Sequence, residues 1–254
     1  MKLMVIGGGG REHAIIKSLA KSPKVDVIYA LPGNGGIAAD AKCVDIGATD
    51  IEAIRDFAKS EAIDYAVVAP DDPLAMGAVD LLEAEGIRCF GPDKKAAVIE
   101  ASKVFSKDLM KKYGIPTAAY EVFTDLEPAL EYLNTAKIPV VVKADGLALG
   151  KGVIIAETRE EAQDAVRSMM VDKKFGESGS RVVIEEFLTG PEVSVLSFTD
   201  GKTVVPMISS QDHKRALDGD KGLNTGGMGS VSPVPFADKE WMQKVEDRII
   251  RPTV

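Results

Sequence analysis

Cysteine, tryptophan and histidine are scarce in this chain of 254 residues, which holds two cysteines, one tryptophan and two histidines. Cys43 and Cys89 are too few for a disulfide framework and do not form a metal-binding spacing, so two reduced thiols in a cytoplasmic protein are expected. His13 and His213 lie in different parts of the sequence, which makes a zinc site improbable.

Long apolar runs and an excess of basic residues are also missing. No run approaches the ~18 apolar residues of a membrane-spanning helix, and the start, MKLMVIGGGG, reads as a strand and not as a signal peptide. Acidic residues outnumber basic ones by 39 to 31, giving a net charge of −8. We therefore expect no membrane and no nucleic acid among its partners, although a local basic pocket can still hold a small anion.

The first hundred residues alternate between strand and helix patterns. Apolar strands are predicted at 2–6, 25–31, 64–69 and 87–90, with helices at 11–22, after a Thr49–Glu52 capping box, and at 73–86. This alternation indicates an α/β domain with a parallel sheet, whose ligand edge lies at the carboxyl ends of the strands. A longer helix is predicted over 94–113.

The rest of the chain follows another pattern. Helices are predicted behind two further capping boxes, Thr124 with Glu127 and Thr158 with Glu161. Strands are expected around the loop in 140–154 and at 181–188, 192–198 and 203–208. These elements favour an antiparallel sheet with helices on one side, whereas 209–233 reads as a long polar, glycine-rich loop.

Four consecutive glycines, Gly7 to Gly10, separate the first strand from the first helix. The dinucleotide fingerprint G-x-G-x-x-G is not met, because its third glycine position falls on Glu12 or His13, so a dehydrogenase is not favoured. Backbone N–H groups at a helix N-terminus still favour an anion, and a plain tight turn is the alternative. The turn PGNGG (32–36) is predicted at the same edge of the sheet.

The stretch VVKADGLALGKGVII (140–154) joins two apolar strands through a glycine-rich, cationic loop. It lacks the G-x-x-x-x-G-K-[ST] spacing of a Walker loop, yet such a hairpin can fold over phosphates. Lys143 ends an apolar strand and is costly to bury unless it meets an anion; a lysine that reaches solvent is the alternative. In VIEEFLTGPEVSV (183–195), Glu185 and Glu186 point to opposite faces, which excludes a glycosidase-type carboxylate pair and leaves a charged edge strand as the alternative.

Six segments, GGGGREHA, PGNGG, KADGLALGKGV, EEFLTGPEVSV, SQDHKR and NTGGMGSVSP, occur in this order along the chain. Together they resemble the phosphoribosylamine–glycine ligase family of ATP-grasp enzymes. The resemblance implies a parallel-sheet domain at 1–100, a first ATP-grasp α+β lobe at 101–190 and an incomplete second lobe at 191–254. It also implies that the nucleotide lies between two lobes.

The resemblance assigns site residues to two ligands. For ATP it implies Lys103, Lys143, Gly146, Gly150, Lys151, Gly152, Glu185, Glu186, Phe187, Leu188 and Glu192. For glycine and phosphoribosylamine it implies Gly8, Gly9, Gly10, Gly33, Asn34, Gly35, Asp212, His213, Lys214, Gly226 and Gly227. The lysines would meet the nucleotide phosphates, the main chain of Glu186 and Leu188 the adenine edge, and Glu192 the ribose.

The implied reaction joins glycine to 5-phosphoribosylamine with ATP, through glycyl phosphate, and yields glycinamide ribonucleotide, ADP and phosphate in purine synthesis. The implied cofactor is Mg²⁺ or Mn²⁺, whose ligands we expect beyond residue 254. We therefore expect no metal ligand in this chain and no ligase turnover by it. We read the chain as an N-terminal fragment. The alternatives are another ATP-grasp carboxylate–amine ligase, which SQDHKR disfavours, and a nucleotide-binding module without catalysis.

Overall fold

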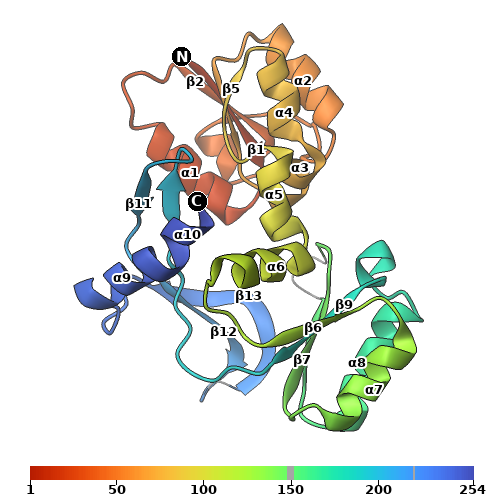
Figure 1. Ribbon diagram of the computed structural model, residues 1–254. Helices are drawn as coiled ribbons and strands as arrows, with labels where there is room; N and C mark the ends of the chain where they lie inside the picture. Colours follow the sequence, from red (N-terminus) through yellow and green to blue (C-terminus); the bar gives the residue numbers. More distant parts are fainter. Residues whose placement is uncertain (148–151, 220) are drawn as a thin grey trace. The chain divides into compact units, whose positions relative to one another are not determined.

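The computed structural model describes residues 1–147, 152–219 and 221–254, apart from the side chains at 223, 224 and 226. It contains two compact units, each described here by itself. The first unit comprises Met1–Ser106, Ala144–Gly152 and Phe175–Gly179, and the second comprises Lys107–Lys143, Val153–Lys174 and Ser180–Val254. Figure 1 shows the ribbon coloured along the sequence.

The first unit is built on a parallel sheet of five strands in the order β3-β2-β1-β4-β5. The strands are β1 (Lys2–Gly7), β2 (Val27–Pro32), β3 (Lys42–Cys43), β4 (Tyr65–Val68) and β5 (Arg88–Phe90). The parallel sheet predicted from the alternating pattern is thus confirmed. Strand β3 was not predicted, because two residues are too short to show a period.

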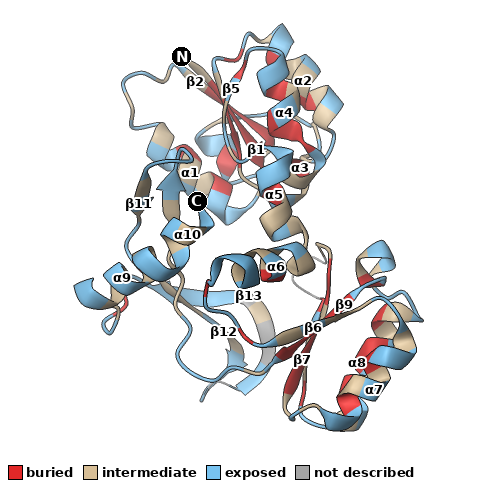
Figure 2. Cartoon of the chain, in the orientation of Figure 1, coloured by how far each residue is buried: buried red, intermediate tan, exposed pale blue. Residues whose placement is uncertain are grey.

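Alternate residues of β1 and β2 enter two separate cores, one on each face of the sheet. Met4, Ile6 and Leu31 are fully buried against α2 (Ile51–Ser60) and α4 (Ala78–Ala84), while Val5 and Ala30 are buried against α1 (Gly10–Leu19) on the other face. Figure 2 shows these strands as the main buried region of the unit. Burying each large aliphatic side chain contributes roughly 1.5–3 kcal/mol, so this double core fixes the carboxyl ends of the strands.

Helices of the first unit differ from prediction at two breaks. The observed helices are α1 (Gly10–Leu19), α2 (Ile51–Ser60), α3 (Asp71–Met76), α4 (Ala78–Ala84) and α5 (Lys94–Ala101), with a 3₁₀ turn, η1 (Ile37–Ala39). The helix predicted over 73–86 is broken at Gly77, whose φ of +97° is left-handed. The helix predicted over 94–113 is broken at extended Ser102, after which α6 (Lys103–Tyr113) begins.

Only one of the three predicted capping boxes holds the helix as expected. Thr158 accepts a hydrogen bond from the N–H of Glu161 and begins α8 (Arg159–Met170). In α2 the cap is Asp50, one residue after the predicted Thr49, and it accepts from Ala53 N–H. Asp125 occupies the N-cap of α7 (Leu126–Thr135) without a capping side-chain hydrogen bond.

The second unit contains a four-stranded sheet in the order β6-β9-β7-β8. Its strands are β6 (Tyr120–Phe123), β7 (Val140–Ala144), β8 (Val153–Ala156) and β9 (Val182–Glu186). The pairs β6–β9 and β7–β8 are antiparallel, as predicted. Helices α7 and α8 pack on each other along one face of this sheet (Figure 1).

The segment predicted as a polar loop is instead a strand pair. Strands β12 (Gln211–Leu217) and β13 (Lys221–Val231) are antiparallel, with register shifts near Arg215. The loop prediction was wrong because it relied on the low strand propensity of glycine and polar residues. Pairing between β12 and β13 supplies the backbone hydrogen bonds in spite of that composition.

Shorter elements complete the description. They are η2 (Gly176–Gly179), β10 (Ser197–Thr199), β11 (Val204–Pro206), α9 (Lys239–Val245), a π-helical turn, η3 (Glu246–Ile250), and α10 (Arg251–Thr253). Strands β10 and β11 form an antiparallel pair. Over the described ranges, no helix combines the length and apolar character required to span a membrane.

Candidate functional site

The glycine turn between β1 and α1 packs closely on the loop that follows β2. A Cβ on Gly8 would lie 2.5 Å from the carbonyl oxygen of Gly33, and Gly33 N–H donates to Gly7 O. Gly9 is the N-cap of α1 and donates its N–H to the buried Glu12 carboxylate at 2.6 Å. Internal packing therefore explains Gly8 and Gly9, while Gly10, the first residue of α1, borders open space.

Asn34 ties the PGNGG turn to the glycine turn. Its amide nitrogen donates to Gly8 O at 2.8 Å, and its side-chain oxygen accepts from Gly36 N–H and Ile37 N–H. Gly35 borders open space. The structure thus brings together the two segments that the sequence placed at one sheet edge, and their role as a sugar-phosphate site stays a prediction.

The base of the glycine-rich loop is fixed to the start of α6. The Asp145 carboxylate accepts from Ser102 Oγ and Val104 N–H, both at 2.9 Å, and its carbonyl accepts from Lys103 N–H. Lys103 Nζ donates to Gly146 O at 3.0 Å. Ser102 Oγ also accepts from Phe105 N–H, so Ser102 and the buried Asp145 cap α6 together and fix Lys103 beside the base of the loop.

Other residues of this loop are placed only in part. Gly146 packs against Ser178, whose Oγ would lie 2.3 Å from a Cβ on the glycine, so a larger residue would displace η2. Gly152 O accepts from Ala144 N–H and closes the hairpin. Gly150 and Lys151 lie outside the described residues, and their assignment to phosphate stays a prediction.

Lys143 lies in a buried ion cluster of the second unit. Its ammonium donates to Glu185 Oε2 at 2.8 Å, and Lys107 Nζ meets the same oxygen at 3.0 Å. Glu185 is 5% exposed, and its Oε1 has no hydrogen-bond partner. The expectation that Lys143 needs an anion is met within the protein by a carboxylate, with one buried oxygen left to accept a donor.

The predicted adenine-binding segment follows directly after β9. Glu186 N–H donates to Ala119 O at 2.9 Å, so only the carbonyl of the Glu186 main chain remains for a ligand. Glu185 is buried and Glu186 exposed, which confirms that they point to opposite faces. Leu188 is 62% exposed and Phe187 half-buried, so the segment presents apolar surface next to the end of β9.

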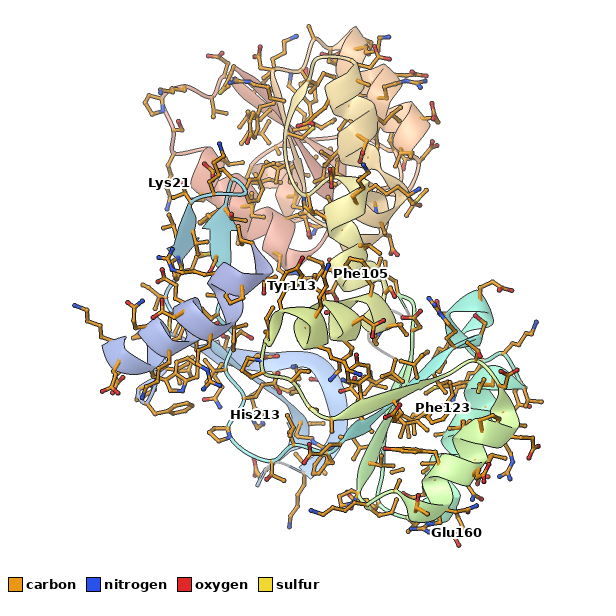
Figure 3. All side chains as sticks on the ribbon, viewed as in Figure 1. Lys21, Phe105, Tyr113, Phe123, Glu160 and His213 are labelled. Carbon is orange, nitrogen blue, oxygen red and sulfur yellow. The ribbon has the colours of Figure 1, made fainter. Side chains whose placement is uncertain are left out.

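A cavity of about 740 Å³ lies in the second unit, around β12 and β13. Its lining comprises Ile155, Gly190, Pro191, Glu192, Gln211, Asp212, His213, Lys214, Arg215, Gly229, Ser230 and Val231. The structure therefore brings Glu192, predicted to bind ribose, to the same cavity as the three residues predicted to bind glycine. Figure 3 labels His213 on this ribbon.

Charges in the cavity are arranged around one lysine. Lys214 Nζ donates to Glu192 and lies 3.6 Å from an Asp212 carboxylate oxygen. The hydrogen bond that Lys214 donates to Glu192, together with the charges of both carboxylates, raises the pKa of Lys214, so it stays cationic. Lys214 links the residue assigned to the nucleotide with those assigned to glycine.

Several predicted and observed residues differ around this cavity. Gly226 and Gly227 both belong to β13; among the described residues of that strand, Gly229 to Val231 line the cavity and Gly227 does not. Sequence reasoning missed Arg215 and Lys107. Arg215 belongs to the SQDHKR motif, and Lys107 follows Lys103 by four residues on a helix, a spacing that places both on one face.

The metal implied by the resemblance does not find a matching set of residues here. Among the described residues, no group of three or more His, Cys, Asp or Glu is placed to hold a metal ion. The two carboxylates that line the cavity, Glu192 and Asp212, already share the Lys214 ammonium. The ammonium group between these two carboxylates repels a second cation and so disfavours the binding of Mg²⁺ at this position.

Two family models cover the chain. The model described as phosphoribosylglycinamide synthetase, N domain, matches residues 1–100, and the ATP-grasp (A) domain of the same synthetase matches residues 101–254. The fold is thus a parallel-sheet domain followed by an ATP-grasp domain, as predicted. The chain belongs to the phosphoribosylglycinamide synthetase family.

Individual relatives agree with this assignment. The phosphoribosylamine–glycine ligases of Ralstonia nicotianae and Escherichia coli K12 are each 51% identical over the whole chain. The chain spans 60% of the length of each of these relatives. Its length is therefore well short of the curated proteins that it matches.

Solved structures give the same picture. A phosphoribosylamine–glycine ligase from Thermotoga maritima aligns with a TM-score of 0.85 and 34% identity, covering 100% of this chain and 60% of that one. The biotin carboxylase domain of 2-oxoglutarate carboxylase from Hydrogenobacter thermophilus aligns with a TM-score of 0.76 at 19% identity, covering 99% of this chain and 57% of that one. The second likeness shows the fold alone.

Proposed function

We propose that this chain provides nucleotide- and glycine-binding residues of an enzyme that ligates glycine to 5-phosphoribosylamine in purine synthesis. The observation that carries the proposal is the single cavity lined by Glu192 and by Asp212, His213 and Lys214. Residues assigned to ATP and to glycine meet there, which ligation requires. The cytoplasmic location predicted from the sequence stays a prediction.

In the proposed reaction, a glycine carboxylate oxygen attacks the γ-phosphorus of ATP, ADP leaves, and glycyl phosphate forms. The amine of phosphoribosylamine then attacks the carbonyl carbon, phosphate leaves, and the nitrogen loses a proton. Positioning and neutralisation of phosphate charge supply most of the acceleration in such transfers. Lys143 and Lys103 would supply positive charge to the nucleotide phosphates. The buried Glu185 Oε1 would accept a hydrogen bond from the adenine ring.

Asp212 and Lys214 suit the two ends of glycine. The ammonium of Lys214 can meet the glycine carboxylate, and Asp212 can meet the glycine amine, because opposite charges at hydrogen-bond distance favour each other. The present ion pairs of Lys214 would be exchanged on binding, which links glycine entry to Glu192 and the nucleotide.

Calorimetric titration of the chain with ADP and with glycine tests this assignment. Lys214→Met should abolish glycine binding, because the ammonium that meets the glycine carboxylate is removed. ADP affinity should change by less than about threefold, because Glu192 loses only its ion pair with Lys214 while the phosphate contacts stay. Ser230→Ala is the matched control in the same cavity. Binding of bicarbonate in place of glycine, or no binding of ADP, would contradict the proposal.

The same titration in EDTA tests the metal. Because Glu192 and Asp212 are both paired with Lys214, ADP affinity should change by less than about threefold on removing Mg²⁺. A loss of about tenfold or more in EDTA would mean that described carboxylates do hold the metal. Glycine-dependent ADP formation with phosphoribosylamine is the direct readout of ligation.

A further inference from the structure

The buried cluster of Lys107, Glu185 and Lys143 contains a lysine that no ligand assignment uses. Lys107 and Glu185 expose only 6% and 5% of their surface, whereas the Lys143 side chain is 26% exposed. Both ammonium groups meet the same carboxylate oxygen, at 3.0 Å for Lys107 and 2.8 Å for Lys143. Such burial of three charges is costly unless each is paired.

The two lysines differ in how much of their hydrogen-bonding capacity is used. Lys107 Nζ donates to Thr117 Oγ1 at 2.8 Å and to Ala118 O at 3.2 Å, besides its contact with Glu185. Two hydrogen bonds and one ion pair therefore hold the Lys107 ammonium, and at 6% exposure it is not open to a ligand. Within the described part of the chain, Glu185 is the one hydrogen-bond partner of Lys143.

The charge of the cluster follows from these contacts. Two ammonium groups and one carboxylate leave a net charge of +1, and the surplus is carried at the more exposed Lys143. Without Lys107, Glu185 would have only Lys143 as a partner, and the pair would be neutral. An anion such as a nucleotide phosphate would then lose its attraction to this position.

We propose that Lys107 is a positioning residue for Lys143, acting through Glu185. Because Lys107 shares Glu185 Oε2 with Lys143 and balances the carboxylate charge, the Lys143 ammonium is left to turn toward a phosphate. The inference rests on the proposed nucleotide site. It adds a residue that touches no ligand and yet sets how strongly phosphate is bound.

Calorimetry with ADP and adenosine separates this role from a structural one. Lys107→Met should weaken ADP binding about tenfold, equivalent to about 1.4 kcal/mol, and change adenosine binding by less than about twofold. Lys111→Met is the matched control, because Lys111 is exposed on the same helix and also lies over the Tyr120 ring. It should leave both affinities unchanged.

A second variant keeps the test decisive if Lys107→Met folds poorly. In the double variant Lys107→Met/Glu185→Gln the two most buried charges are both removed, and the more exposed Lys143 again supplies a net charge of +1. ADP affinity should therefore recover to within about threefold of the unmodified chain, because the surplus charge is restored. A mere packing role for Lys107 predicts no such recovery.

Distinct results would overturn the inference. Equal losses for ADP and adenosine, an unchanged ADP affinity in Lys107→Met, or no recovery in the double variant would each show that Lys107 does not act through the charge of Glu185. If Lys143→Met weakens ADP while Lys107→Met does not, the nucleotide site stands and only this inference fails. If the unmodified chain binds neither ligand, the proposed nucleotide site fails as well.

Discussion

Two free cysteines differ sharply in their surroundings, although neither was expected to do more than stay reduced. Cys43 is exposed on β3, where it packs against Gly33, and Cys89 is half-buried in β5. Burial, and to a lesser degree the charge of Glu83, raises the pKa of the Cys89 thiol to about 12. The thiolate is the reactive form, so Cys89 should be inert at neutral pH.

A disulfide reagent such as DTNB should therefore react at pH 8 with one thiol quickly and with the second only after unfolding. Cys43→Ser should remove the fast phase and Cys89→Ser the slow one. Because folding raises the pKa of Cys89, the contribution of this thiol to the free energy of unfolding is fully present below about pH 9, the pKa of the unfolded thiol. That contribution is lost as the pH rises toward 12. Two equally fast thiols would contradict this reading of Cys89.

Among the elements, the break between α5 and α6 depends on a residue that is far away in sequence. Ser102 Oγ accepts from Phe105 N–H and so caps α6 locally, while the Asp145 carboxylate accepts from Ser102 Oγ and from Val104 N–H and thereby completes the cap. Asp145→Ala should lower the free energy of unfolding by about 1–3 kcal/mol, because buried donors lose their acceptor. Urea unfolding measures this directly.

Asp125→Ala provides the control, since Asp125 also stands at a helix N-cap but makes no capping hydrogen bond. Its effect should be below about 0.5 kcal/mol. Equal losses for the two variants would show that the Asp145 bonds add nothing to stability.

The same break shows what the sequence could predict. Short apolar runs predicted the parallel sheet and the second-unit hairpin, because β1, β2 and β7 are buried along nearly their whole length. Such local patterns could not place the end of α5, because part of the cap of α6 comes from Asp145, after three intervening elements. The strand pair β12–β13 was missed for a related reason: the two strands are stabilised by hydrogen bonds to each other, which residue composition does not reveal.

Site residues show the same division. A lysine at the end of an apolar strand signalled a need for an anion, and Lys143 indeed meets one. That the anion is Glu185, shared with Lys107, depends on contacts between distant segments that a single sequence does not reveal. The meeting of Glu192 with Lys214 in one cavity is of this kind as well.

For the molecule as a whole, the β10–β11 hairpin leaves an apolar face open. Its register places Phe198 opposite Val205, and residues two apart on a strand share a face, which adds Leu196 and Met207. All four are between 44% and 63% exposed. Such a face on paired strands favours association with another apolar surface.

We therefore expect this chain to self-associate as its concentration rises. The double variant Leu196→Lys/Val205→Lys should shift sedimentation profiles toward the monomer, because two charges oppose burial of the face. Leu217→Lys, which replaces an exposed leucine of β12 outside the hairpin, should have little effect. A chain that stays monomeric at every concentration would refute the expectation.

The hydrogen bonds between the start of α6 and Asp145 also have a consequence during synthesis on the ribosome. The five strands of the first sheet are complete once Phe90 has emerged, but the unit also draws on Ala144–Gly152 and Phe175–Gly179. At roughly 5–20 residues per second, translation takes several seconds to pass from Ser102 to Asp145. Throughout that interval the sheet is finished, but Val104 N–H at the start of α6 lacks the Asp145 carboxylate and must be satisfied by water. The order of translation thus sets the order in which this unit can become fully folded.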